Sequence, residues 1–298
     1  MENFILIILA ITIGYVLNRL KIFPEDAAAI LNKFVIFISL PAMILLQIPK
    51  LDFSMDTLIP VIVAWLVIIV TALLTLFISK IFNFTKEVTG ALMLVAVLTN
   101  SSFLGIPIIN AYLGDEALPF ILVYDQLGTF LALATYGIFI AAYYSNKSEI
   151  NVQIMAVKIL TFPPFISLVI ALFFMGVSFP IEITKVLAVL ANTIVPLALV
   201  AVGLQLQLKL PGHEIKPFGL ALFIKLVIAP MIALAIIKTA GWTSLAANVS
   251  VMEAGMAPMI TAGAMASLSG LAPRLSSAIV GYGILISFFT TAVLFKFI

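Results

Sequence analysis

The sequence predicts an all-α membrane protein with ten transmembrane helices in two inverted five-helix repeats. Of its 298 residues, 64% are hydrophobic and only 9% are charged, whereas soluble domains carry roughly 25% charged residues. Apolar runs of about 20 residues, the length that crosses a bilayer as a helix, recur along the whole chain. Two distant runs are interrupted by polar residues, glycine and proline, which predicts broken fourth and ninth helices.

The ten apolar runs are separated by short polar or Pro/Gly-containing segments. The first lacks a basic leader and a small-residue cleavage site, so we expect a spanning helix and not a removable signal. The fourth, fifth and ninth are longer than about 20 residues, as expected of tilted or broken helices. The expected limits are 3–20, 25–48, 57–80, 87–112, 117–144, 151–176, 182–207, 216–238, 243–268 and 274–297.

Prolines occur at corresponding places in the two halves. Pro41 in the second span corresponds to Pro196 in the seventh, and Pro107 in the fourth corresponds to Pro258 in the ninth. Five spans per half is an odd number, so the halves must enter the membrane in opposite directions. This arrangement is a common plan among secondary transporters.

The two repeats are expected at residues 1–144 and 152–298, joined by the short polar link 145–151. With the N-terminus outside, eight lysines and arginines near the span ends lie on the cytoplasmic side and four lie outside. Cytoplasmic loops carry the excess of positive charge in membrane proteins. We therefore predict a multi-pass protein of the cytoplasmic (inner) membrane with both termini outside.

The two breaks predict a binding site for an anion. Proline disrupts a helix but suits the first turn of a new one, so Pro107 and Pro258 are each expected to begin a half-helix near the middle of the bilayer. Converging half-helix N-termini carry unpaired N–H groups and partial positive charge, which favours a carboxylate. The alternative is a pair of structural kinks whose polar groups bond to neighbouring backbone.

Polar side chains beside the first break could contact the same ligand. Asn100, Ser101 and Ser102 are expected just before the break, where they can donate hydrogen bonds, and Asn110 is expected one turn after it.

Three ionisable residues fall deep within predicted spans: Asp125, Lys225 and Glu253. A charge at the centre of the bilayer costs at least about 2.5–3.5 kcal/mol, so such residues pair, face a cavity or become neutral. Glu253 could take up a proton or help to hold Na⁺, and Gln126 could reach a ligand beside Asp125. Alternatively, Lys225 extends to the cytoplasmic interface, and Asp125 makes a structural hydrogen bond.

Several other functional classes are excluded by what the sequence lacks. It has no cysteine and one histidine, which leaves no basis for disulfides or for a Cys/His metal site. It has no phosphate-binding loop of the Walker type. Its basic residues are scattered singly, unlike those of nucleic-acid-binding proteins. We expect no enzyme activity, no cofactor and no nucleic-acid partner.

Two regions of the sequence resemble the auxin efflux carrier family. KIFPED at 21–26, followed by LNKFV at 31–35 and Leu40-Pro41, is similar to its first two helices. NSSFLGIPII at 100–109, continuing to YLGD at 112–115, is similar to its first crossover helix.

The resemblance covers essentially the whole chain and implies a fold shared with bile-acid sodium symporters. It implies a scaffold of spans 1, 2, 6 and 7, against which a transport domain of spans 3–5 and 8–10 moves as an elevator. It also implies a homodimer formed through the scaffold. The long cytosolic loop of plant carriers is replaced here by residues 145–151, so no regulation through that loop is expected.

The resemblance also implies roles for individual residues. Asn100 and the backbone around Pro107 and Pro258 would bind a substrate carboxylate. Asp125 or Gln126 would take the place of a substrate-contacting glutamine in plant carriers. Glu253 departs from the plant pattern and is similar to the glutamate of the symporters' Na⁺ sites, which implies cation coupling.

The leading hypothesis is a secondary transporter of a small organic anion, such as malate, malonate or auxin, that is proton-coupled or driven by the membrane potential. A second hypothesis adds Na⁺ coupling at Glu253. A third is a membrane sensor that binds the anion without moving it. The expected partners are the anion, H⁺ or Na⁺, the lipid bilayer and a second copy of the chain.

Overall fold

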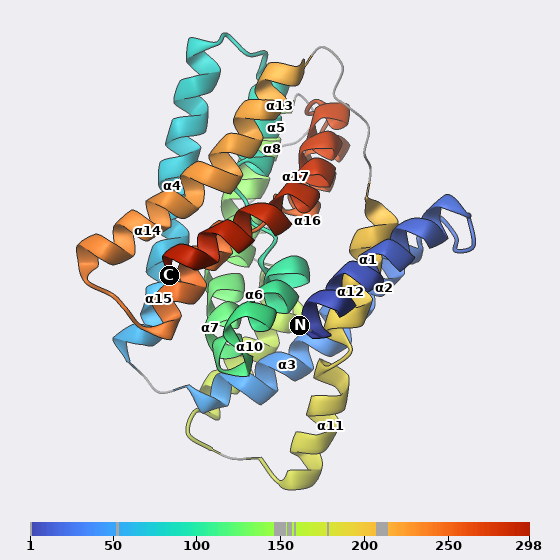
Figure 1. Cartoon of the computed structure of the whole chain (residues 1–298), viewed down its shortest axis with the longest axis vertical. Coiled ribbons are helices and arrows are strands. Elements are labelled where there is room, and N and C mark those ends of the chain that lie inside the picture. The colour runs from blue at the N-terminus through green and yellow to red at the C-terminus, as the bar shows by residue number, and fades with distance from the viewer. Residues whose placement is uncertain are drawn as a thin grey trace.

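A computed structural model describes residues 2–51, 54–145, 153, 157, 159–177, 179–206 and 214–298. Within these ranges every regular element longer than a single bridge is a helix (Figure 1). This confirms the predicted all-helical class. Most of the expected link at 145–151, and the start of the sixth expected span, lie outside the described residues.

Six helical stretches of the described residues are long and apolar enough to cross a membrane, and they coincide with the second, third, fifth, seventh, eighth and tenth expected spans. The first and sixth expected spans fall on shorter apolar helices, and the fourth and ninth are each divided. The six stretches are Ala27–Lys50, Met55–Ile81, Asp115–Tyr144, Ile181–Gln205, Ile215–Ala240 and Pro273–Phe297.

One set of helices, here called the first group, comprises α1, α2, α3, α10, α11 and α12. α12 packs along α1 and against α2, and α3 packs against α10 and α11. In Figure 1, α1, α2 and α12 lie together, and α3, α10 and α11 lie near one end of the molecule. The bounds are α1 Glu2–Arg19, α2 Ala27–Phe34, α3 Leu40–Gln47, α10 Pro163–Phe173, α11 Ile181–Ala191 and α12 Ile194–Gln205.

The remaining helices form the second group, in which α4, α5, α15, α16 and α17 make the main packing contacts. The two groups meet through α1 against α6, α3 against α7, and α12 against the turn at residues 101–105. The bounds are α4 Met55–Ile81, α5 Lys86–Val95, α6 Ile106–Leu113, α7 Leu118–Val123, α8 Ile138–Tyr144, α13 Ile215–Phe223, α14 Ala229–Ala240, α15 Leu245–Ala254, α16 Ile260–Leu268 and α17 Pro273–Leu294.

The backbones of α1 and α12 approach closely at two glycines. A Cβ atom on Gly14 would lie 2.2 Å from the carbonyl oxygen of Val200, and one on Gly203 would lie 2.2 Å from that of Ile11. No side chain fits at such distances, and small residues are what allows helices to approach this closely in membranes. These glycines join the first and seventh expected spans.

Three π-helical turns end two residues before a proline. They are η1 (Val35–Ser39), η3 (Ser101–Gly105) and η8 (Ile224–Ile228), which precede Pro41, Pro107 and Pro230. Proline has no N–H to donate, and its ring collides with the carbonyl four residues earlier in a regular helix. The wider π-turn relieves this conflict, and such turns often mark functional sites.

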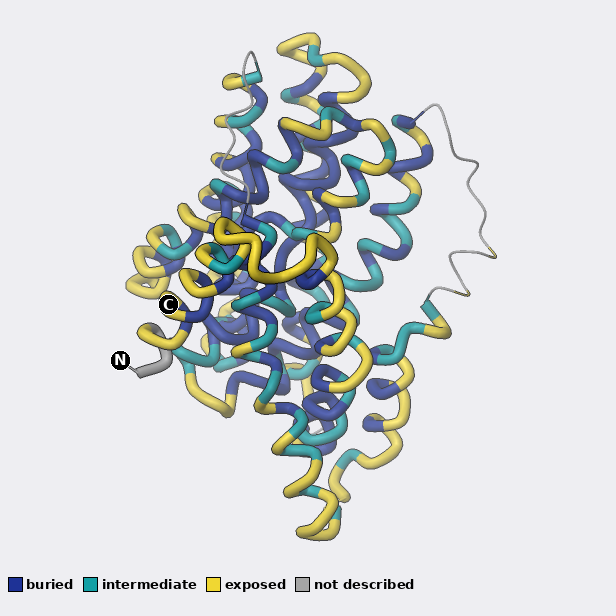
Figure 2. The backbone as a smooth tube through the Cα atoms, turned by 90° about the vertical axis from the view of Figure 1, so that its right-hand side faces the viewer, coloured by how far each residue is buried: buried dark blue, intermediate teal, exposed yellow. Residues whose placement is uncertain are grey.

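The exposed and buried residues have the distribution expected in a bilayer. Buried residues are concentrated in the middle of the molecule, and exposed ones follow its outer helices (Figure 2). Many of the exposed residues are large and apolar, including Ile8, Phe173 and Val189. Soluble monomers rarely expose contiguous apolar surface of this kind, so these helices are suited to contact lipid.

Candidate functional site: the crossing of two broken helices

The two predicted breaks cross each other in the interior. Helix α5 ends at Val95 and helical structure resumes at Ser101, while α15 ends at Ala254 and α16 begins at Ile260. Thr99 and Pro258 pair as an isolated antiparallel bridge. The breaks are bonded on both sides of this bridge, because the Asn100 amide donates to the Ala257 carbonyl (2.9 Å) and the Met259 amide donates to the Leu98 carbonyl (3.1 Å).

This pairing explains how unwound backbone survives at membrane depth. An unpaired backbone group in the bilayer costs several kcal/mol, so irregular chain there must find partners in protein or water. Residues 94–101 and 250–258 are buried throughout, and each break supplies partners for the other. A single broken helix would leave these groups unpaired.

The positions of the two prolines correct the sequence prediction. Pro107 does not begin a half-helix: it lies six residues into the helical segment that resumes at Ser101, as the second residue of α6. Pro258 lies in the extended break, two residues before α16. The helix resumes before Pro107, because the π-turn η3 accommodates this proline. Ser101 and Ser102 therefore follow the first break instead of preceding it.

The side chain of Asp125, which comes from a later helical segment, lies at the start of the helix that follows the first break. Ser101 and Ser102 both donate their hydroxyl groups to its Oδ1 atom, and the Gln126 amide donates to Oδ2 at 2.6 Å. Asp125 is buried. The prediction placed a ligand carboxylate at this helix N-terminus, but the chain places its own carboxylate there.

Lys225 reaches the crossing from η8 and does not extend to the interface. Its side chain is fully buried, and its Nζ atom donates to the Thr99 hydroxyl and to the Ala254 carbonyl at 3.2 Å. Thr99 also shares a hydrogen bond with Tyr124. The lysine thus links η8 to both breaks, and the snorkelling alternative is wrong.

Glu253 is the third buried ionisable group at the crossing. It lies in the last turn of α15 and is completely inaccessible to solvent. Neither carboxylate oxygen has a hydrogen-bond partner among the described residues, although Lys225 and Asp125 are near enough for their charges to act on it. A Cβ atom on Gly105 would lie 2.6 Å from Oε1 and 2.8 Å from Oε2, so a larger residue at this position would have to displace the carboxyl group.

Replacing Gly105 with alanine should therefore displace the Glu253 carboxyl group. We expect a loss of about 1–3 kcal/mol from overpacking, read as a lower midpoint of thermal unfolding in detergent. Gly219→Ala is the matched control, because a Cβ atom there meets nothing within 4 Å, and alanine stabilises a helix by up to about 1 kcal/mol over glycine. Equal midpoints for the two variants would contradict the tight contact.

The other predicted residues differ in their surroundings. The Asn100 side-chain nitrogen and the Gln126 side-chain oxygen are buried, and neither has a partner among the described residues. Asn110 lies further along α6, and its Oδ1 atom is likewise unpartnered within those residues. No hydrogen bond in the described part of the chain connects Asn110 to Asp125 or its serines.

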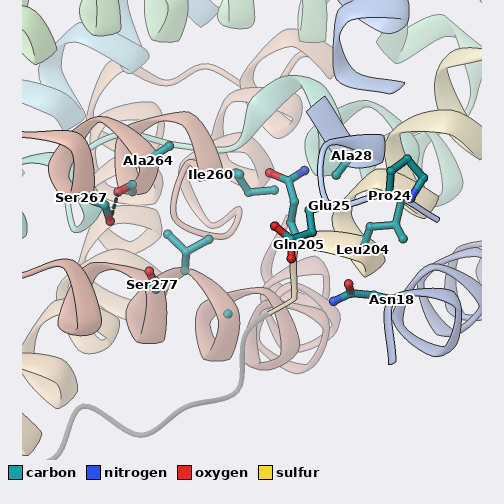
Figure 3. A pocket seen from close by; sticks show the side chains of 13 residues that line it. Asn18, Pro24, Glu25, Ala28, Leu204, Gln205, Ile260, Ala264, Ser267 and Ser277 are labelled. Atoms are coloured by element: carbon teal, nitrogen blue, oxygen red, sulfur yellow. Dashed lines mark hydrogen bonds between the residues drawn. The ribbon is translucent and has the colours of Figure 1, made fainter. Parts of the chain in front are cut away.

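A cavity of about 550 Å³ lies between the two groups of helices. Figure 3 shows Asn18, Pro24, Ala28 and Leu204 of the first group on one side and Ile260, Ala264, Ser267 and Ser277 of the second group on the other. This volume is within the range of small-molecule sites, about 300–1,000 Å³. The lining residue Ile260 begins α16, so the cavity reaches the helix that follows the second break.

The N-terminus of α16 is the half-helix start on this cavity. The first i→i−4 bond runs from the Gly263 amide to the Met259 carbonyl, so the amides of residues 260–262 have no intrahelical acceptor. Unpaired amides and the helix dipole favour an anion at such a position. The half-helix that the second break was expected to start thus begins at Ile260, two residues beyond Pro258.

Several site residues were missed by the sequence analysis. Thr99 and Tyr124 join the Lys225 network, and Gly105 accommodates Glu253. The cavity residues contributed by α1, α2 and α12 were also missed. The sequence did show a polar residue, Thr99, beside Asn100 and a glycine, Gly105, before Pro107, and these could have indicated site residues. The cavity residues could not be found in this way, because the cavity depends on how distant helices pack.

Comparison with known proteins places the chain in a family. Residues 1–295 match the family described as membrane transport protein. A transporter of Methanothermobacter thermautotrophicus, described as uncharacterized, is 26% identical over 89% of this chain and 87% of its own length. Another uncharacterized transporter, from Methanocaldococcus jannaschii, is 28% identical over 86% of this chain and 85% of its own length. The chain therefore belongs to the membrane transport protein family, which is also described as the auxin efflux carrier family. It is a multi-pass membrane protein of a transporter family, and that family does not catalyse a chemical reaction.

Proposed function

We propose that the protein is a secondary active transporter of a small organic anion, most simply a carboxylate. The observation that carries this proposal is the crossing of two broken helices beside a cavity of about 550 Å³. Broken helices whose ends converge inside the membrane are the usual construction of transporter binding sites.

The substrate carboxylate would bind at the N-terminus of α16. The amides of residues 260–262 supply donors there, and the unpartnered side-chain nitrogen of Asn100 supplies another close to the bridge. Pro258 keeps this backbone extended. Ser101, Ser102 and Gln126 would act indirectly, because they hold Asp125, while Pro107 and Asn110 shape the helix beyond the first break.

Alternating access would come from movement of the second group of helices against the first. The first group corresponds to the scaffold of spans 1, 2, 6 and 7, and the second to a transport domain of spans 3–5 and 8–10. The cavity between the groups supports this division, as does the preference of each helix for partners within its own group. Ten spans in two inverted repeats, the fold of bile-acid symporters and a scaffold-mediated homodimer belong to the same proposal.

Coupling to protons follows from the charges at the crossing. Two buried carboxyl groups, Asp125 and Glu253, and one buried ammonium group, Lys225, lie at the crossing, and the charges of Asp125 and Lys225 both act on Glu253. An uncompensated buried charge is strongly unfavourable, so one proton on Glu253 would make the cluster neutral. The Na⁺ alternative is favoured by the two unpartnered oxygens of Glu253. However, no group of three or more His, Cys, Asp or Glu residues that could hold a metal occurs in the described ranges.

The distribution of basic residues supports insertion in the cytoplasmic membrane with both termini outside. In that orientation the cavity faces the cytoplasm, because it lies at the end of α1 and the start of α2.

Flux measurements in proteoliposomes test the proposal. We expect uptake or efflux of at least one labelled mono- or dicarboxylate, with malate and malonate in the first panel, that responds to a pH gradient or membrane potential. Replacement of Na⁺ by choline at fixed pH should leave the flux unchanged, and a loss would favour the Na⁺ alternative. Specific binding without flux would favour a sensor. Neither flux nor binding by inserted, folded protein would contradict the proposed function.

A further inference from the structure

We propose that the Lys225 ammonium group is a built-in cation, bound in an oxygen site that would otherwise take an alkali metal ion. The proposal deepens the transport function and rests on it for its consequence for coupling. The presence of the cation can be tested without any transport measurement.

The first observation is the pattern of oxygens around Nζ. The lysine donates to a hydroxyl, that of Thr99, and to a backbone carbonyl, that of Ala254. The Glu253 carboxylate is close enough to interact with it by charge. Hydroxyl, carbonyl and carboxylate oxygens are the ligands that hard cations prefer.

The second observation is the place of the Ala254 carbonyl at the end of α15. The Gly255 amide donates to the carbonyls of Val251 and Met252, and the Met256 amide donates to that of Glu253. The Ala254 carbonyl instead accepts from Lys225. Carbonyls at the end of a half-helix carry the negative end of its dipole, and in transporters with broken helices such ends coordinate the coupling ion.

The third observation is the burial of the lysine. Lys225 is 0% exposed and lies among the largest fully buried side chains described. A lysine that only balanced surface charge would extend its flexible stem toward water. Here the whole side chain is buried, and it places the ammonium group between the two breaks. An alkali ion could not share that position, because two cations would repel each other there.

The consequence is a transporter that needs no metal ion at this position. Removing the positive charge while keeping the volume should uncover the oxygen site. The Lys225→Met variant would then bind Na⁺ between Thr99, Ala254 and Glu253, in a site that the natural chain keeps filled.

Thermal unfolding of the full chain in lipid nanodiscs tests this inference, with NaCl compared with choline chloride at equal ionic strength. We expect no Na⁺-dependent change in the natural protein. We expect Lys225→Met to unfold at a lower temperature in choline and to rise by at least roughly 2–4 °C with saturating Na⁺. Lys238→Met, which removes an exposed lysine of α14, should respond like the natural protein.

Two further variants keep the inference open to refutation. Lys225→Gln replaces Lys225→Met if the latter does not fold, and the same Na⁺ response is expected. Adding Thr99→Val removes one oxygen ligand and should abolish the response. Saturable stabilisation of the natural protein by Na⁺, an absent response in the neutral variants, or an intact response without the Thr99 hydroxyl would each overturn the inference. Loss of anion flux alone would bear on the proposed function and not on this site.

Discussion

Replacing Glu253 with glutamine should abolish the pH dependence of anion flux while leaving the protein folded. The residue is buried with no hydrogen-bond partner for either carboxylate oxygen within the described chain, and a proton on it balances Asp125 against Lys225. A single coupled proton changes the driving equilibrium at most about tenfold per pH unit. Glutamine keeps the shape of the side chain but cannot release a proton.

The measurement is the initial rate of labelled carboxylate flux between pH 5.5 and 8 in proteoliposomes. The natural protein should show a graded dependence, and Glu253→Gln a flat profile at a lower rate. Glu182→Gln, at an exposed position at the start of α11, is the matched control and should keep the graded profile. An unchanged pH profile in Glu253→Gln would exclude Glu253 as the proton carrier.

Replacing Asp125 with alanine should cause the largest loss of stability. Two serine hydroxyls and the Gln126 amide donate to this carboxylate, and hydrogen bonds to a charged group are worth about 1.5–3 kcal/mol each. The variant leaves these buried donors without their acceptor. We expect a loss of about 3–5 kcal/mol, because each buried donor left unsatisfied costs about 1–3 kcal/mol.

Thermal unfolding in a mild detergent measures this loss as a fall in the midpoint of roughly 6–20 °C. Asp125→Asn should fall less, because its carbonyl oxygen still accepts a hydrogen bond. Asp115→Ala, at an exposed acidic residue ten positions earlier, should stay near the natural midpoint. If Asp125→Ala unfolds at the same temperature as Asp115→Ala, the carboxylate does not hold the helix that follows the first break.

The general architecture could be read from the sequence because bilayer physics limits the choices. Apolar length alone located the helical stretches, and six expected spans coincide with long helices of the described chain. The breaks were also visible, because Asn100, Gly105 and Pro107, or Glu253, Gly255 and Pro258, have no place in a regular apolar helix. The division of the chain into repeats remains a prediction.

The inner details could not be read in the same way. The prolines were expected to start half-helices. Instead, Pro107 follows a π-turn within a continuing helix, and Pro258 lies in the extended bridge. The first helix start was expected to be free for a ligand, but Asp125, 24 residues after Ser101, fills it. Such contacts depend on how separate helices pack, and local residue patterns carry little information about that.

Labelling of a single cysteine in the cavity tests whether the substrate binds between the two groups of helices. The chain contains no cysteine, so Ala264→Cys places one thiol on the cavity wall, and Leu268→Cys, at an exposed position outside the lining on the same helix, is the control. We expect a membrane-impermeant maleimide to modify Ala264→Cys from one membrane face, and we expect a transported carboxylate to slow this reaction but not that of Leu268→Cys. Modification of Ala264→Cys that no transported anion affects would contradict a substrate site between the two groups of helices.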